Sequence, residues 1–91
     1  MYFLGKAIIY GEKRKFGINV GYRPHLAKKN SDELYGIEFL EVSENVVDKY
    51  VDCIINTPYE KVDYSYLKMN EKYDIREGRN VVGEIILLGE M

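Results

Sequence analysis

The side chains best suited to catalysis are few in this sequence, and none has a partner at a useful spacing. Cys53 is the one cysteine and lies in an apolar run, where a thiol packs more often than it attacks a substrate. His25 has no metal-ligand spacing around it. Gly5 and Lys6 lack the upstream glycine and intervening residues of a phosphate-binding loop. We therefore expect neither an enzyme nor a metal or cofactor site.

Charge is distributed unevenly along the chain, which directs attention to binding. The net charge is −2, but residues 1–29 carry seven basic groups against one acid, and residues 30–91 carry six basic groups against fourteen acids. A basic segment binds a polyanion such as RNA when its side chains cluster in space. Lysines that protect strand edges from pairing give the same pattern. The candidate phosphate contacts are Lys13, Arg14, Lys15, Lys28 and Lys29.

Length and composition are those of one small globular domain spanning residues 1–91. The sequence is 46% hydrophobic and 31% charged, with no low-complexity tract. Residues 1–6 lack the basic start and long apolar run of a signal peptide, and no stretch has the apolar length of a membrane helix. A single cysteine excludes an internal disulfide, which is typical of a reducing cytosol, so we expect a cytoplasmic protein without membrane contact.

Runs of β-branched and aromatic residues, separated by turn signals, predict strands throughout. The expected strands cover residues 3–10, 16–20 continuing at 26–29 after Pro24, 35–41, 50–56, 69–76 and 81–88. The last is apolar on both faces, so we expect it to be central in the sheet. Two segments, 43–52 and 62–72, are also compatible with short helices, although the valines of the first favour a loop that leads into a strand.

About six strands at this spacing predict an all-β fold, a small closed six-stranded barrel that is mainly antiparallel with Greek-key connections. The side chains expected to face inward are Ile9, Ile37, Phe39, Cys53, Ile55, Ile75, Val82 and Ile86.

Two short motifs add a family resemblance. Residues 21–24 read Gly-Tyr-Arg-Pro, and residues 76–83 read Arg-Glu-Gly-Arg-Asn-Val-Val-Gly. Together they resemble the two ends of the C-terminal β-barrel, the third domain, of bacterial elongation factor Tu, over roughly residues 6–88. The GTP-hydrolysing domain of that family has no counterpart in this sequence. The resemblance supports the barrel and implies a link to the translation machinery.

The resemblance implies specific roles for the motif residues, with two departures. In that family the glycine-arginine turn and the strand after Gly-Tyr-Arg-Pro lie on or near the surfaces that touch transfer RNA and the nucleotide-binding domain. Here Arg79 stands where the family has a second glycine and Asn80 where it has arginine, so contact with transfer RNA through this turn is in doubt. Arg23 and Arg76 are expected to be structural, each paired with a glutamate at a barrel corner.

Two functional hypotheses from different classes follow. The first is a non-catalytic protein-interaction module that engages or imitates part of the translation machinery, or a toxin or factor directed at it. The overall acidity of the chain favours this hypothesis. The alternative is a module that binds transfer RNA or other RNA through the basic N-terminal third.

The tyrosine-rich segment between Pro58 and Tyr73 is longer than the corresponding connection in the elongation factor. Tyr64 and Tyr66, at alternate positions there, are suited to stacking on bases or anchoring a partner, although rings that cap the open end of the barrel explain them as well. The complete set of candidate binding residues is Lys13, Arg14, Lys15, Arg23, His25, Lys28, Lys29, Tyr64, Tyr66 and Arg79.

Overall fold

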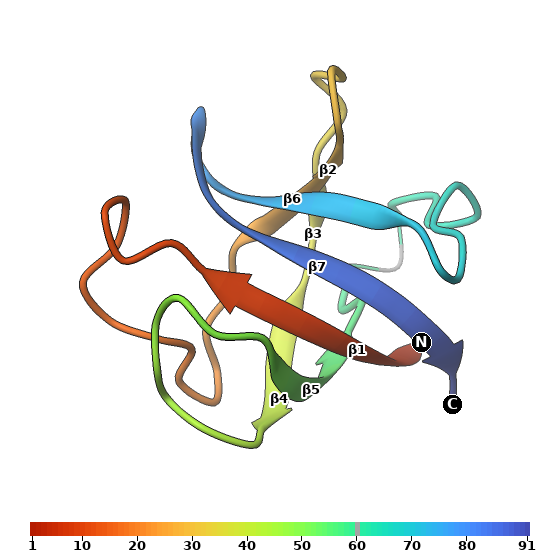
Figure 1. The fold of residues 1–91 in the computed structure, drawn as a ribbon. Coiled ribbons are helices and arrows are strands. Elements are labelled where there is room, and N and C mark those ends of the chain that lie inside the picture. The colour runs from red at the N-terminus through yellow and green to blue at the C-terminus, as the bar shows by residue number, and fades with distance from the viewer. Residues whose placement is uncertain (60) are drawn as a thin grey trace.

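The computed structural model describes residues 1–59 and 61–91 and shows one strongly curled antiparallel sheet that forms a half-barrel (Figure 1). Its strands are β1 (Tyr2–Ile9), β2 (His25–Lys28), β3 (Tyr35–Gly36), β4 (Glu38–Val42), β5 (Val51–Asn56), β6 (Lys72–Glu77) and β7 (Asn80–Glu90). Their spatial order is β3-β2-β6-β7-β1-β5-β4. The all-β prediction is therefore confirmed, and β7 lies centrally between β6 and β1 as expected.

The core fills the concave side of the sheet because alternate side chains of each strand point there. In β1 the buried positions are Phe3, Gly5, Ala7 and Ile9, whereas Tyr2, Leu4 and Lys6 are exposed. The other buried apolar side chains come from every strand and include Leu26, Tyr35, Phe39, Val51, Ile55, Tyr73, Ile75, Ile85 and Leu87.

Seven of the eight side chains expected to face inward are buried, and Ile86 is the exception. The β6–β7 register shifts between Ile75 and Arg76, so that Ile75 pairs with Gly83 and Arg76 pairs with Val81. Val82 is the extra residue of this β-bulge and shifts the alternation along β7. Because of that shift, Ile85 is fully buried and Ile86 only partly so.

The segment predicted as a strand at 16–20 is instead a bent connection between β1 and β2. Its central residue, Ile18, is only 2% exposed, whereas Phe16 and Val20 are each 69% exposed. A Cβ at Gly17 would lie 2.5 Å from the backbone nitrogen of Val46, so this connection packs tightly against the β4–β5 connection. The sequence does alternate between apolar residues and small or polar ones here, but the alternation reflects a single side chain, Ile18, that packs into the core. Neither 43–52 nor 62–72 forms a helix.

The backbone geometry explains why glycine occupies two positions of the second motif. Gly78 and Arg79 form the two-residue turn between β6 and β7, and Gly78 has a φ of 62°, a left-handed conformation that glycine adopts at little cost. A positive φ at the first turn position is typical of a type II′ hairpin. At Gly83 any Cβ would collide with the backbone carbonyl oxygen of Ile8 on the neighbouring strand.

Candidate functional site

The two motifs meet in space and form one corner of the fold. The Tyr22 hydroxyl donates a hydrogen bond of 2.6 Å to Glu77, and the Arg14 guanidinium forms an ion pair of 2.7 Å with the same carboxylate oxygen. The guanidinium also lies 4.3 Å from the centroid of the Tyr22 ring, which stacks on Phe39. Burial and the adjacent Glu77 carboxylate raise the pKa of Tyr22. This corner places Arg14, a candidate phosphate contact, in an architectural ion pair.

The two arginines expected to pair with glutamates behave differently. Arg23 forms an ion pair of 3.3 Å with Glu38, but its side chain is 59% exposed, so the pair is at the surface. Arg76 makes no ion pair with any described residue, and its guanidinium donates a 2.9 Å hydrogen bond to the carbonyl oxygen of Ser31. The expected Arg76–glutamate pair is therefore wrong, because Arg14 occupies the carboxylate of Glu77 instead.

The basic candidates do not gather into one patch. Lys28 pairs with Tyr73 in the β2–β6 register. Tyr73 is four residues from Glu77, which holds Arg14. At about 3.3 Å per residue, these two positions are about 13 Å apart along β6. Lys29 is neutralised by two carboxylates, as described below. Lys13 and Lys15 are exposed and form no ion pair with a described residue. Two of the five candidate phosphate contacts, Arg14 and Lys29, are thus paired with carboxylates, and only Lys13, Lys15 and Lys28 are left for a phosphate track.

His25 and Arg79 are also exposed. His25 begins β2 opposite Gly36 and Arg76. In the described part of the chain, no group of three or more His, Cys, Asp or Glu residues is arranged to hold a metal ion. Arg79 lines shallow hollows on both sides of the hairpin turn, one with Asp32 and one with Glu12.

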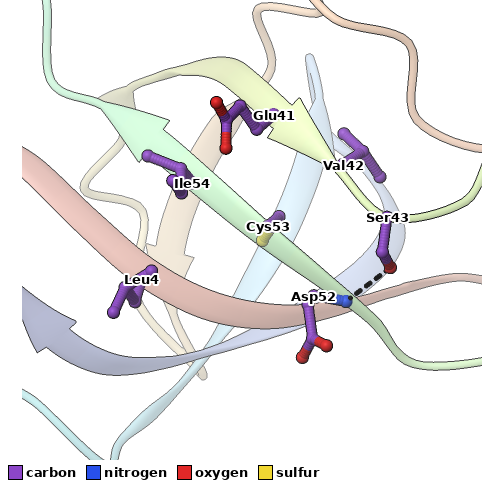
Figure 2. Close-up of a pocket in the computed structure, with 7 residues that line it drawn as sticks. All are labelled: Leu4, Glu41, Val42, Ser43, Asp52, Cys53 and Ile54. Carbon is purple, nitrogen blue, oxygen red and sulfur yellow. Dashed lines mark hydrogen bonds between the residues drawn. The ribbon is translucent and has the colours of Figure 1, made fainter.

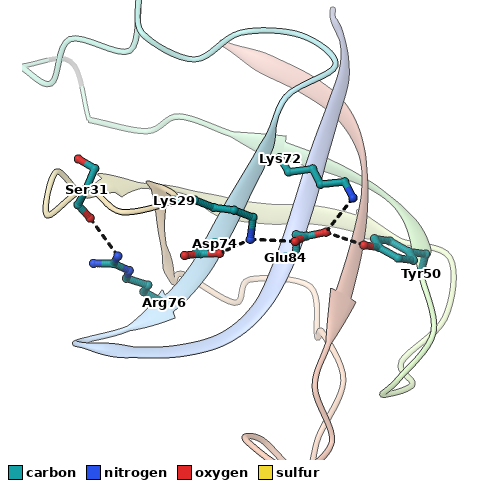
Figure 3. A network of polar contacts seen from close by, with 7 residues as sticks. All are labelled: Lys29, Ser31, Tyr50, Lys72, Asp74, Arg76 and Glu84. Atoms are coloured by element: carbon teal, nitrogen blue, oxygen red, sulfur yellow. Dashed lines mark hydrogen bonds and ion pairs between the residues drawn. The ribbon is translucent and has the colours of Figure 1, made fainter.

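A half-buried polar network crosses the convex face of the sheet (Figure 3). Asp74 on β6 and Glu84 on β7 are directly opposed in register, and the Lys29 ammonium lies between them, 2.7 Å from Asp74 and 2.9 Å from Glu84. Tyr50 donates a 2.6 Å hydrogen bond to Glu84, and Lys72 lies 3.8 Å from it. Without Lys29, two like charges would face each other across the strands.

The pKa values of Glu84, Lys29 and Tyr50 are shifted away from the neutral range in which acid–base catalysis is most efficient. The Tyr50 hydrogen bond, Lys29 and Lys72 together hold the pKa of Glu84 below its usual value, and the two carboxylates raise the pKa of Lys29. The Glu84 hydrogen bond raises the pKa of Tyr50 to about 12. A general acid or base works best with a pKa near the operating pH. The network is therefore suited to joining β2, β6, β7 and the loop before β5.

The tyrosine-rich connection covers one end of the core. Tyr64 is only 6% exposed, and its hydroxyl donates a 2.6 Å hydrogen bond to the carbonyl oxygen of Gly36. Its ring lies against Tyr35, and Leu67 is buried beside them. Tyr66 is different, since it is 54% exposed with the Lys28 ammonium 5.8 Å from its ring centroid. Of the two candidate tyrosines, only Tyr66 presents its ring to solvent.

An apolar hollow of about 310 Å³ lies on the outer side of β4, β5 and β1 (Figure 2). We call it the outer hollow and define it by its lining residues, Leu4, Glu41, Val42, Ser43, Asp52, Cys53 and Ile54. Leu4 and Ile54 are cross-strand partners, and Ile54 in turn opposes Glu41. The outer hollow thus has an apolar floor and two carboxylates at its rim.

Exposed apolar side chains extend this surface beyond the outer hollow. Leu4 is 46% exposed, and Tyr2 and Leu88, on β1 and β7, are 49% and 45% exposed. At the rim, the Asp52 side chain is 76% exposed and its carboxylate lies 3.9 Å from the Lys6 ammonium, a distance that gives a weak pair in water. An apolar centre with a polar rim is the usual composition of a protein-binding surface.

Cys53 lies at the outer hollow, but its thiol is not poised for reaction. Only 4% of the residue is exposed, and burial raises the pKa of the thiol to about 12. The thiolate that acts as a nucleophile is therefore scarce at neutral pH. Cys53 contributes packing, as the sequence predicted.

Of the residues that make the outer hollow, only Cys53 is singled out by the sequence, as a packed thiol. The signal was present in adjacent apolar pairs such as Phe3-Leu4 and Ile54-Ile55, because alternation in a strand sends one member of each pair outward. The apolar alternation predicts a strand at Phe16, whereas this residue lies in an exposed loop.

Comparison with known proteins gives no assignment: no protein-family model matches the chain, and no curated protein matches it. Among residues 1–59 and 61–91, no helix has the length and apolar character needed to cross a membrane.

Proposed function

We propose that this chain is a non-catalytic protein-interaction module whose fold is a closed six-stranded barrel similar to the third domain of elongation factor Tu. The observation that carries the functional part is the outer hollow with its exposed apolar surroundings. The partner class that the motif resemblance suggests is a protein of the translation machinery, or a toxin or factor that acts on that machinery.

The connectivity of β3 and β4 supports a closed barrel. These strands are separated only by Ile37, yet they occupy the two opposite ends of the sheet order. A single bent strand from Tyr35 to Val42 therefore takes part in both edges. Backbone hydrogen bonds from Ile37 to the Pro24 carbonyl and from Phe39 to the Tyr22 carbonyl continue its pairing with the segment before β2. Counted as one bent strand, β3 and β4 reduce seven strands to six.

The outer hollow supports protein binding because the apolar groups there gain most from being covered. Leu4 and Ile54 meet across β1 and β5, and the carboxylates of Glu41 and Asp52 stand beside them. Binding hot spots combine an apolar anchor that fills a pocket with surrounding polar contacts that exclude water. The outer hollow has this arrangement, with Leu4 at its exposed edge.

Protein binding is favoured over the RNA alternative on electrostatic grounds. Arg14 and Lys29, two of the five expected phosphate contacts, are committed to carboxylates within the fold. Tyr64, one of the two expected stacking rings, is buried. The chain as a whole has a net charge of −2, which opposes binding to a polyanion.

The test is capture from a lysate of the source cells, with bound protein and bound RNA both measured. Leu4→Glu places a charge in the outer hollow from a side chain that is already 46% exposed, so the fold should persist. We expect the wild type to retain a protein partner in a complex little affected by salt, and Leu4→Glu to lose it. The matched control is Leu34→Glu, which charges a comparably exposed leucine (41%) outside the outer hollow and should retain the partner. Salt-sensitive RNA capture that Leu4→Glu does not change would overturn the proposal in favour of RNA binding.

A further inference from the structure

We propose that the outer hollow, taken as the binding site of the proposed function, accepts a second copy of this chain. The inserted element is the exposed part of the β1–β2 connection, which we call the basic tip and define as Lys13, Lys15 and Phe16. Each molecule carries one basic tip and one outer hollow, so the contact runs head to tail.

The basic tip presents its aromatic ring from a fixed backbone. Phe16 is 69% exposed, yet the residues on both sides are anchored. The Arg14 side chain donates a 3.1 Å hydrogen bond from Nε to the Phe16 carbonyl while it pairs with Glu77, and Gly17 packs against the β4–β5 connection. Ile18 then enters the core with 2% exposure. A ring held in this way loses little conformational entropy on binding.

The charges of the basic tip and the outer hollow are complementary. Lys13 and Lys15 are exposed and form no ion pair with a described residue. Across the proposed contact stand Asp52, whose side chain is 76% exposed, and Glu41, which forms no ion pair within the described residues. An apolar ring with Lys15 directly before it in the chain therefore meets an apolar floor flanked by carboxylates, and such complementarity fixes orientation and partner.

The outer hollow is also large enough for one aromatic side chain. The outer hollow, of about 310 Å³, is open to solvent and lies at the lower end of the range of pockets that hold compact ligands, which begins near 300 Å³. Phe16 is not among the residues that line the outer hollow of its own molecule, so the contact forms between molecules. A head-to-tail contact of this kind closes into a ring or grows as a chain.

The experiment is sedimentation velocity across a concentration series that reaches about 1 mM, which detects complexes with a Kd as weak as about 1 mM. We expect the wild type to sediment faster as concentration rises. Lys15→Glu and Asp52→Lys, made separately, should each weaken association by about tenfold or more because like charges then face each other. The double variant Lys15→Glu with Asp52→Lys should recover association, which a merely structural defect would not do. Lys49→Glu is the matched control, since it reverses an exposed lysine outside both surfaces and should leave association unchanged.

Two outcomes would overturn the inference. One is a wild type that remains monomeric throughout the series, and the other is a double variant that associates no better than the single variants. Neither outcome removes the proposed function, because capture of a different protein that is lost in Leu4→Glu would place that protein in the outer hollow instead.

Discussion

Replacing Lys29 by methionine should expose how strongly the network of Figure 3 holds the convex face together. The change keeps a long side chain but removes the ammonium that separates Asp74 from Glu84. These carboxylates are cross-strand neighbours whose side chains are 13% and 11% exposed, so each would face a like charge with little water to screen it.

The expected loss of unfolding free energy lies between two known limits. Removing one partner of a fully buried ion pair costs about 3–5 kcal/mol, and breaking an exposed pair costs about 0.2–1 kcal/mol. The Lys29 side chain is 47% exposed, and Tyr50 and Lys72 still support Glu84, so an intermediate loss of about 2 kcal/mol is expected. For a domain of this size that corresponds to a fall in melting temperature of about 10 °C.

The loss of unfolding free energy in Lys29→Met should also depend on pH. The pKa of Glu84 is below its usual 4.5 in the folded protein, so its stabilisation is present above that value and is lost as pH falls through the folded pKa. The difference in unfolding free energy between wild type and Lys29→Met should therefore shrink in acid, because protonated carboxyls no longer repel each other.

Urea unfolding at pH 7 and at low pH, followed by circular dichroism, measures this difference. The matched control is Lys49→Met, which breaks an exposed ion pair with Glu44 of nearly the same length, 2.8 Å, and should cost less than about 1 kcal/mol. If Lys29→Met costs no more than Lys49→Met at pH 7, the network does not stabilise the fold and the argument from burial is wrong.

Three further predictions concern single residues. Tyr64→Phe removes the hydrogen bond to a buried carbonyl and should cost about 1 kcal/mol in urea unfolding, whereas Tyr66→Phe should change stability by less than about 0.5 kcal/mol; equal effects would contradict the capping role. Gly83→Ala drives a methyl group into the Ile8 carbonyl and should cost about 3 kcal/mol or more, with a fully stable variant indicating that β1 and β7 do not approach this closely. The Cys53 thiol, with its pKa raised to about 12, should react with iodoacetamide at neutral pH far more slowly in the folded protein than in urea, and equal rates would show that it is accessible.

Much of the fold could be read from local pattern, because strands report their burial through alternation and composition. Residues 81–88 were apolar on both faces, and β7 is indeed central. The error at Ile86 arose from the β-bulge opposite Ile75, where one extra residue reverses the alternation. Such a bulge depends on the pairing of two strands, so neither strand reveals it alone.

The site was harder to predict because exposure depends on what each residue packs against. Tyr64 and Tyr66 are nearly indistinguishable in sequence, yet one donates to Gly36 and the other lies in solvent. In the sequence, Leu4 and Ile54 are only members of apolar runs, and their pairing on the outer side follows from the β1–β5 register. Phe16 fitted a strand pattern, whereas its exposure results from neighbouring residues that anchor the loop.

Contacts within the fold explain part of the uneven distribution of charge along the chain. Arg14 and Lys29, from the basic first third, each bind carboxylates of the acidic later strands, so part of the opposite charge cancels within the fold. Lys15, next to Phe16, and Glu41, at the outer hollow, are among the charges that form no ion pair within the described residues. The intermolecular contact proposed above would bring these opposite charges together at two apolar surfaces, which is the arrangement that fixes orientation in a protein complex.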